Sequence, residues 1–136
     1  MIAVSRRYRF PAAHVLRNEA LSDDENVRVY GKCANRHGHD YGLVVTVAGP
    51  VDPASGRIID PARLDALVGR HVLEPLAHSD LSRHPRFAGC ISTAENVARV
   101  VHEQLAGPIE QDSSARLLRV QIQETRKNRF EYGEER

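Results

Sequence analysis

The sequence lacks the features that would place the protein in a membrane or outside the cell. It has only two cysteines, Cys33 and Cys90, no tryptophan, and no apolar run that approaches the length of a membrane span. Two cysteines are too few for a disulfide framework, and the first 30 residues lack the apolar core and cleavage site of a signal peptide. We therefore expect a cytoplasmic protein with free thiols and no membrane attachment.

The sequence also lacks an excess of charge of either sign. Its 19 Lys and Arg residues against 18 Asp and Glu residues give a formal net charge of +1. That balance excludes a broad basic face for nucleic acid, so any anionic ligand would be met locally. The length of 136 residues fits a single domain, spanning residues 1–136, that can bury a core without disulfides or a structural metal.

Two histidines separated by a single residue are the most informative feature of the chain. His37 and His39 run directly into an apolar segment that predicts a strand, and on a strand both imidazoles would point to the same face. Gly38 between them is expected to keep that face open for close approach. Two nitrogens on one face form half of a zinc site, and Cys33 lies close by in sequence.

A third histidine completes the predicted site. His14 ends the even-numbered face of the first predicted strand, which also carries Phe10 and Ala12. Three histidine ligands leave one zinc position open for substrate or water, which is the catalytic rather than the structural pattern. His14 taken alone is better interpreted as a buried core histidine, and the His37–His39 pair with the nearby Cys33 makes the metal interpretation the stronger one.

Alternation of apolar and polar residues predicts the strands. They are expected at residues 2–14, 39–48, 57–59, 117–124 and 130–132. In the strand at 117–124, Leu118, Val120 and Ile122 form the expected inner face, so Glu124 also points inward. A carboxylate at the end of an apolar face must be paired or must await a ligand with N–H donors.

Capping residues predict where two helices begin. Ser22, with Glu25 three residues later, fits a capping box for a short helix in a polar excursion. Asp60 before Pro61 fits an N-cap followed by proline at the first helical position.

A further helix is predicted near the middle of the second half of the chain. Ser92 and Glu95 fit a second capping box, which would give Glu95 a structural role. Gly107 and Pro108 are expected to end this helix. Strands, then two core-facing helices, then strands predict an α+β fold in which two helices cover one face of a four-stranded antiparallel sheet, in the order ββααββ.

These residues, taken as a set, resemble the family of 6-pyruvoyltetrahydropterin and 6-carboxytetrahydropterin synthases, which have the tunnelling fold. The matching segments occur in the family's order and cover nearly the whole chain. They are Phe10-Pro11-Ala12-Ala13-His14, Cys33 with His37-Gly38-His39-Asp40-Tyr41, Asp52-Pro53-Ala54-Ser55-Gly56, Leu76 with His78, Ser92-Thr93-Ala94-Glu95-Asn96, and Glu124-Thr125.

The resemblance implies a set of site residues and an oligomer. It implies that zinc binds to His14, His37 and His39, and that Cys33 and His78 move protons on the substrate side chain. Glu124 would bind the N–H donors of a pterin ring, while the segment with Thr93 and Glu95 would line the pterin pocket from an adjoining subunit. The family forms trimers that stack into hexamers, in which the sheets close a barrel.

The resemblance implies the reaction of a zinc-dependent lyase, but different features of the sequence are similar to different branches of the family. The long interval between His14 and Cys33 is similar to the enzymes that convert 7,8-dihydroneopterin triphosphate to 6-pyruvoyltetrahydropterin, whereas the short gap from Cys33 to His37 is similar to the carboxy-forming branch. A side-chain aldolase and a non-catalytic pterin-binding protein are the alternatives. They arise because Ala77 stands where the family has an Asp that orients His78, a role that Asp80 could take over.

Overall fold

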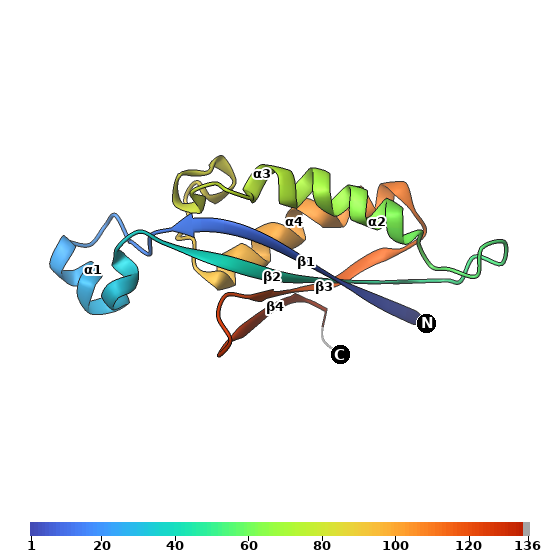
Figure 1. Cartoon of the computed structure of the whole chain (residues 1–136), viewed down its shortest axis with the longest axis horizontal. Helices are drawn as coiled ribbons and strands as arrows, with labels where there is room; N and C mark the ends of the chain where they lie inside the picture. Colours follow the sequence, from blue (N-terminus) through green and yellow to red (C-terminus); the bar gives the residue numbers. More distant parts are fainter. Residues whose placement is uncertain (135–136) are drawn as a thin grey trace.

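A single antiparallel sheet forms the centre of the molecule. The structure, a computed structural model, describes residues 1–134 and orders the strands β1-β2-β3-β4. The helices α2, α3 and α4 lie on one face of this sheet, which leaves the other face open (Figure 1). The strands are β1 (Ile2–His14), β2 (His37–Gly49), β3 (Arg116–Gln123) and β4 (Arg129–Gly133), and the helices are α1 (Asp23–Tyr30), α2 (Pro61–Val68), α3 (Glu74–Leu76) and α4 (Ala94–Asp112). The predicted α+β architecture is confirmed.

The hairpin of β1 and β2 is the longest element of the sheet. The two strands pair from Ile2 opposite Gly49 to His14 opposite His37. Strand β2 therefore begins at His37, two residues earlier than predicted, because pairing with β1 continues through the histidines. The alternation buries Phe10 and Tyr41, whose rings stack with centroids 5.2 Å apart, on the face under the helices.

Strand β3 contains an irregularity that changes its inner face. Thr46 of β2 lies opposite Arg119, but the next residue, Val47, lies opposite Leu117, so Leu118 has no partner of its own. This β-bulge turns Leu117 into the core and leaves Leu118 only half-buried. The prediction that Leu118 faces inward was wrong, whereas Val120 and Ile122 are fully buried as expected.

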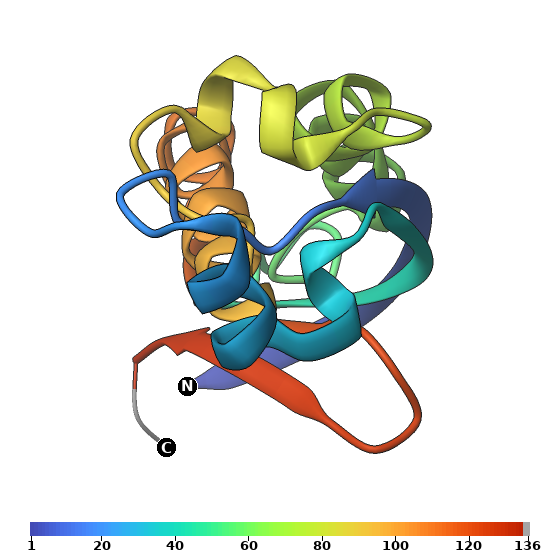
Figure 2. The ribbon, with the colours of Figure 1, turned by 90° about the vertical axis from the view of Figure 1, so that its left-hand side faces the viewer.

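The capping residues of the first two predicted helices have the expected roles. The Ser22 side chain accepts a hydrogen bond from the Glu25 N–H, and the Glu25 carboxylate reaches back to the Ser22 N–H, which completes the capping box of α1. The Asp60 side chain accepts from the Ala62 N–H, with Pro61 at the start of α2. Figure 2 shows α1 at the near end of the molecule, beyond the strands.

Helices α2 and α3 form one continuous helical rod that contains a wider π turn at Gly69–Leu73. Pro75 explains this turn, because a proline has no N–H to donate and its ring would clash with the carbonyl of His71, four residues earlier. Arg86 donates to that free His71 carbonyl. Leu64, Val68 and Val72 of the rod are fully buried against the sheet.

Helix α4 differs from the prediction at both ends. Its N-cap is Thr93, which accepts from the Asn96 N–H, so the predicted capping box of Ser92 and Glu95 was wrong. The helix also continues through Pro108 to Asp112. An interior proline costs about 3 kcal/mol, and burial of Ile109, one turn beyond the fully buried Leu105, offsets that cost.

The segment before α2 is not a strand. Ile58 and Ile59 are buried, but the backbone there pairs with no strand and is held by turn bonds such as that from the Asp52 N–H to the Arg57 carbonyl, so the predicted strand at 57–59 was wrong. Apolar side chains there fill the core without sheet pairing. Within residues 1–134, no helix is both long and apolar enough to cross a membrane.

Candidate metal centre and substrate site

Three histidines gather where β1 ends and β2 begins. His14 lies directly opposite His37, and His39 lies opposite Ala12, two residues before His14. The ring centroids are 4.4 Å apart for His14 and His37, 5.0 Å for His14 and His39, and 4.9 Å for His37 and His39. One nitrogen of each imidazole lies within 4.8 Å of the others. The sheet register thus brings together the three residues that the sequence pattern predicted.

Backbone carbonyls set the tautomer of two of these imidazoles. His14 Nδ1 lies 2.7 Å from the Ser92 carbonyl, and His37 Nδ1 lies 2.7 Å from the Asn35 carbonyl. A carbonyl only accepts, so each Nδ1 must carry the proton, and each Nε2 keeps a free lone pair. Both rings are therefore oriented through Nδ1, which leaves Nε2 as the nitrogen that can bind a metal.

The third imidazole has a buried nitrogen without a partner. His39 Nε2 is the one buried side-chain nitrogen or oxygen in residues 1–134 that has no hydrogen-bond partner. Burial lowers the pKa of His14 to about 4 and also lowers the pKa of His39, with a further contribution from neighbouring imidazoles. Neutral imidazoles are the form that binds metal, so the donor set fits a zinc ion.

Gly38 does not have the steric role that its position suggested. A Cβ atom at Gly38 would meet the Ala12 carbonyl at 3.8 Å, which is ordinary van der Waals contact. It also lies on the opposite face of β2 from His37 and His39, since side chains alternate along a strand. The expectation that this glycine opens the metal face was wrong.

Glu124 lies beside the histidines, as the alternation along β3 predicted. Its Oε2 is 3.7 Å from His14 Nε2 and 3.9 Å from His39 Nε2, too far for hydrogen bonds. Burial raises the pKa of Glu124, whose side chain is 17% exposed; the nearby His37 acts in the opposite direction, and the charge of Glu95 raises the pKa. The Tyr41 hydroxyl, 3.3 Å from His14 Nδ1, is buried in the same region. The carboxylate is thus available to a ligand that carries N–H donors or positive charge.

Cys33 is placed near the cluster by the backbone. It lies half-buried in the 3-10 turn Gly31–Ala34, and its carbonyl accepts from the Leu16 N–H at 2.9 Å. Leu16 is only two residues beyond His14, so this bond ties the cysteine turn to the end of β1. In residues 1–134 no hydrogen bond joins the thiol to a histidine of the cluster. Cys90, by contrast, packs against the core and its thiol lies 3.5 Å from the Phe87 carbonyl.

His78 lies beside β1, on the edge of that strand that does not pair with β2, and its backbone conformation is strained. Its φ of 60° is the only positive value for a non-glycine residue in the described chain. The His78 N–H donates to the Pro11 carbonyl at 2.6 Å, and the Ala13 N–H donates to the Ser79 carbonyl at 2.9 Å. These bonds hold the exposed His78 beside the strand that ends in His14, although in residues 1–134 its imidazole makes no hydrogen bond with the cluster.

Asp80 is engaged by groups other than His78. Its carboxylate accepts from the Ser82 N–H at 3.0 Å and pairs with Arg36 at 2.8 Å and with Arg83 at 3.7 Å. In the described residues no hydrogen bond joins Asp80 to the His78 imidazole. The pair with Arg36 instead connects the His78 loop to the residue that precedes His37.

Ser82 extends this connection to His14. Its hydroxyl accepts from the Val15 N–H at 2.7 Å and lies 2.9 Å from the Ser92 hydroxyl. Ser92 is the residue whose carbonyl accepts from His14. A polar chain through Arg36, Asp80, Ser82 and Ser92 therefore supports two of the three histidines. Sequence reasoning missed this support because its bonds join loops far apart in the chain and one of them uses a backbone carbonyl.

The predicted pterin-pocket segment starts α4 beside the cluster. Thr93 caps the helix, and Glu95 is exposed in its first turn. Without a capping role, the Glu95 carboxylate faces solvent near Glu124, whose pKa its charge raises. The structure thus brings Glu95 and Glu124 into one electrostatic environment.

The sequence matches one known protein family over almost its whole length. The model of the 6-pyruvoyl tetrahydropterin synthase family matches residues 3–135. The chain is 44% identical over 105 residues to human 6-pyruvoyl tetrahydrobiopterin synthase, which covers 75% of this chain and 72% of the human protein. It is 25% identical over 155 residues to the 6-carboxy-5,6,7,8-tetrahydropterin synthase of Haemophilus influenzae, covering 98% of this chain and all of that protein.

The fold also matches a solved structure closely. The structure of Caenorhabditis elegans 6-pyruvoyl tetrahydropterin synthase aligns with a TM-score of 0.89 at 39% identity, covering 98% of this chain and 96% of that chain. The Plasmodium vivax 6-pyruvoyl tetrahydropterin synthase structure aligns with a TM-score of 0.67 at 15% identity, covering 97% and 98%. The second match bears on the fold alone.

Proposed function

This chain belongs to the 6-pyruvoyl tetrahydropterin synthase family, and on that premise we propose that it is a zinc-dependent lyase. Its substrate would be 7,8-dihydroneopterin triphosphate, converted to 6-pyruvoyltetrahydropterin with release of triphosphate. The observation that carries the zinc dependence is the convergence of three imidazoles, one of them with a buried Nε2 that has no partner in residues 1–134. A buried nitrogen without a partner is destabilising unless a ligand satisfies it.

The histidines would hold the metal through Nε2 of His14 and His37, whose Nδ1 atoms donate to carbonyls, and through His39 Nε2. Zinc, when bound, supplies a Lewis acid that acidifies the substrate's side-chain hydroxyls. Glu124, beside the histidines, would accept hydrogen bonds from the amino group and the adjacent ring N–H of the pterin. Binding of the ring there would direct its side chain to the metal.

Two further residues would move protons. The Cys33 thiolate would remove a proton from a side-chain carbon, and expulsion of triphosphate with its bonding electron pair would complete the elimination. His78 would exchange a proton with a side-chain oxygen during the tautomerisation that follows. Both residues are bonded through their backbones to β1 or the residues just after it. In residues 1–134 their side chains make no hydrogen bond with the cluster, so the site is proposed to be completed in a homo-oligomer, with Thr93 and Glu95 facing the pterin of an adjoining subunit.

The pyruvoyl-forming reaction is favoured over the carboxy-forming one by the higher identity to 6-pyruvoyl enzymes, 44% against 25%. The carboxy-forming reaction on the same substrate, with loss of acetaldehyde, is the second candidate. It is kept because the short gap from Cys33 to His37 is similar to that of the carboxy-forming branch.

Product analysis tests the proposal. Zinc-loaded protein would be incubated with 7,8-dihydroneopterin triphosphate, and pterins, triphosphate and acetaldehyde would be followed separately by mass spectrometry. We expect triphosphate together with a pyruvoyl pterin. A carboxy pterin with acetaldehyde would assign the second reaction, and tight pterin binding without any product would refute the enzyme proposal.

The two cysteines provide a matched control. Cys33→Ala should reduce product formation by about 100-fold or more, within the range that general acid–base groups contribute. Cys90→Ala, which removes a thiol packed against the core, should leave turnover near the wild-type rate. Equal activity of the two variants would exclude Cys33 as the base.

A further inference from the structure

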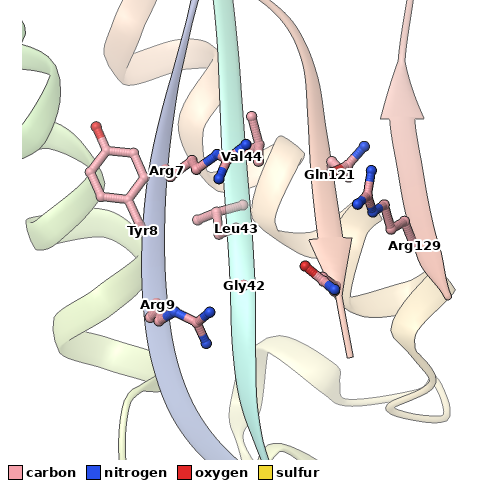
Figure 3. A pocket seen from close by; sticks show the side chains of 9 residues that line it. Arg7, Tyr8, Arg9, Gly42, Leu43, Val44, Gln121 and Arg129 are labelled. Atoms are coloured by element: carbon pink, nitrogen blue, oxygen red, sulfur yellow. The ribbon is translucent and has the colours of Figure 1, made fainter. Parts of the chain in front are cut away.

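The face of the sheet that no helix covers carries a basic depression, and none of the residues that line it has a role in the proposed reaction. Its volume is about 350 Å³, and guanidinium and carboxamide side chains surround it (Figure 3). The polar side chains that line it are Arg7, Arg9, Gln121, Gln123 and Arg129. The helices are on the opposite face of the same strands, as is the side chain of the buried His14.

One row of residues across the whole sheet explains this depression. Arg9 of β1 lies opposite Gly42 of β2, Gly42 lies opposite Gln123 of β3, and Gln123 lies opposite Arg129 of β4. Residues directly opposite one another share a face, so the row places an arginine at each edge. Three strand spacings put their backbones roughly 14 Å apart. Because Gly42 has no side chain, the floor between them stays open.

The guanidiniums in this depression are largely free of competing carboxylates. Within residues 1–134, Arg7 and Arg129 have no ion-pair partner. Arg9 pairs with Asp40 at 3.0 Å, but the two side chains are 72% and 60% exposed, so the pair is easily exchanged for a stronger anion. The Glu131 carboxylate on this face accepts from Gln121. Since the whole chain has a net charge of only +1, the excess of positive charge is local.

The chemistry of the lining selects the ligand. Guanidiniums bind phosphate oxygens in bidentate fashion, and carboxamide N–H groups donate to the same oxygens. Arginines on both edge strands favour an extended anion with several phosphoryl groups over a single small one. No cluster of imidazoles or carboxylates suited to a cation lies on this face of the described chain.

We propose that Arg7, Arg9, Gln123 and Arg129 form a polyphosphate-binding site on the open face of the sheet, and that its ligand is inorganic triphosphate. The choice of triphosphate rests on the proposed function, because this is the group that the reaction would release. The site is distinct from the histidine cluster, since side chains alternate between the two faces along each strand, and Arg7 and Arg9 stand at odd-numbered positions of β1 whereas His14 stands at an even-numbered one.

Calorimetric titration of the purified full-length protein with sodium triphosphate tests the site. Arg9→Gln with Arg129→Gln should weaken binding at least about tenfold, because each substitution removes a charge-assisted hydrogen bond. Gly42→Val, which fills the floor without changing charge, should also weaken it. Arg28→Gln with Arg70→Gln, an equal charge change at exposed positions on helical segments, should stay within about twofold of wild type.

The outcomes separate this inference from the proposed function. His37→Ala should retain triphosphate binding, since that histidine is on the other face; loss of binding in this variant would place the anion at the histidine cluster and overturn the inference. Equal affinity of the wild type and the Arg9→Gln, Arg129→Gln protein would also overturn it. Turnover by wild-type protein without triphosphate binding would refute the site alone, whereas binding without turnover would refute the proposed function alone.

Discussion

The Nδ1 and Nε2 sides of the histidine cluster differ in whether their nitrogens find hydrogen-bond partners within the chain. On the Nδ1 side, His14 and His37 donate to carbonyls at 2.7 Å, and Ser82 and Asp80 fix the loops that supply this support. On the Nε2 side, the Glu124 oxygen is 3.7–3.9 Å from His14 and His39, and His39 Nε2 has no partner in residues 1–134. The first side is complete in the folded chain, and the second requires a ligand.

The largest effect on zinc affinity is expected from a substitution on the Nε2 side, where a nitrogen lacks a partner. His39→Ala should weaken zinc binding by roughly 100-fold or more, since even residues behind a metal ligand alter affinity 10- to 100-fold. In metal-free protein the same change should not lower stability, because it removes a buried nitrogen whose desolvation costs about 1–3 kcal/mol. Zinc competition with a chromophoric chelator and thermal denaturation of the metal-free protein measure the two effects.

His84 provides the control for this comparison. Its Nδ1 accepts from the Arg86 N–H in the loop after α3, and it is not part of the metal-ligating group. His84→Ala should therefore leave zinc affinity unchanged. A wild-type zinc affinity in His39→Ala would show that His39 is not a ligand.

Glu124→Gln should separate substrate binding from metal binding. The amide keeps the shape of the side chain but loses the charge that strengthens hydrogen bonds to N–H donors, so pterin affinity should fall about 10- to 100-fold. Zinc content should stay at one ion per chain. Fluorescence titration with a dihydropterin and metal analysis of the same samples provide the readouts. Loss of zinc with unchanged pterin affinity would instead make Glu124 a metal ligand.

A smaller effect is expected on the completed side. Ser82→Ala removes the hydroxyl that accepts from the Val15 N–H and contacts the Ser92 hydroxyl, so the carbonyl that orients His14 is held less firmly. Zinc affinity should fall about tenfold, as for other groups that orient metal ligands. Ser55→Ala removes a comparable hydrogen bond in the exposed turn at Asp52 and should not change it. Equal zinc affinities in the two variants would argue against the polar chain through Ser82.

The same distinction explains which parts of the fold could be predicted from the sequence. The caps at Ser22 and Asp60 depend on neighbours in sequence and were confirmed, whereas the capping box at Ser92 and the strand at 57–59 were wrong. The path of α4 through Pro108 and the bulge at Leu118 depend on tertiary burial and register, and both were missed. Local patterns were sufficient at the starts of α1 and α2, whereas the start of β2 and both ends of α4 depended on pairing and packing with distant parts of the chain.

The site follows this rule as well. The three metal-ligand candidates could be predicted because their spacing on strands implies a shared face, and Glu124 because of its alternation. The support through Ser92 and the Arg36–Asp80 pair could not, because a carbonyl has no sequence signature and an ion pair between distant loops follows no period. Cys33 and His78 stay predictions, since their side chains make no hydrogen bond with the cluster in residues 1–134.

The smallest effect is expected for a group of side chains remote from the histidines, whose hydrogen bonds are already made within the chain. This group is Arg6, Tyr8 and Asp65. Asp65 of α2 accepts from Arg6 Nε at 2.8 Å and from the Tyr8 hydroxyl at 2.7 Å, and these bonds, that from Arg6 first, lower the pKa of Asp65. A lowered pKa stabilises the fold above the unfolded value of about 3.9, and this stabilisation is lost as the pH falls through the folded pKa. Because the side chains are about 40% exposed, Asp65→Asn should lower Tm at pH 7 by only about 2–4 °C.

The difference in Tm between Asp65→Asn and wild type should shrink as the pH falls below about 4, while zinc content stays unchanged. Thermal denaturation between pH 7 and pH 3 measures it, with Glu103→Gln, which breaks one exposed pair with Arg99, as the weaker control. A Tm difference that is independent of pH would mean that Asp65 acts by packing rather than by charge.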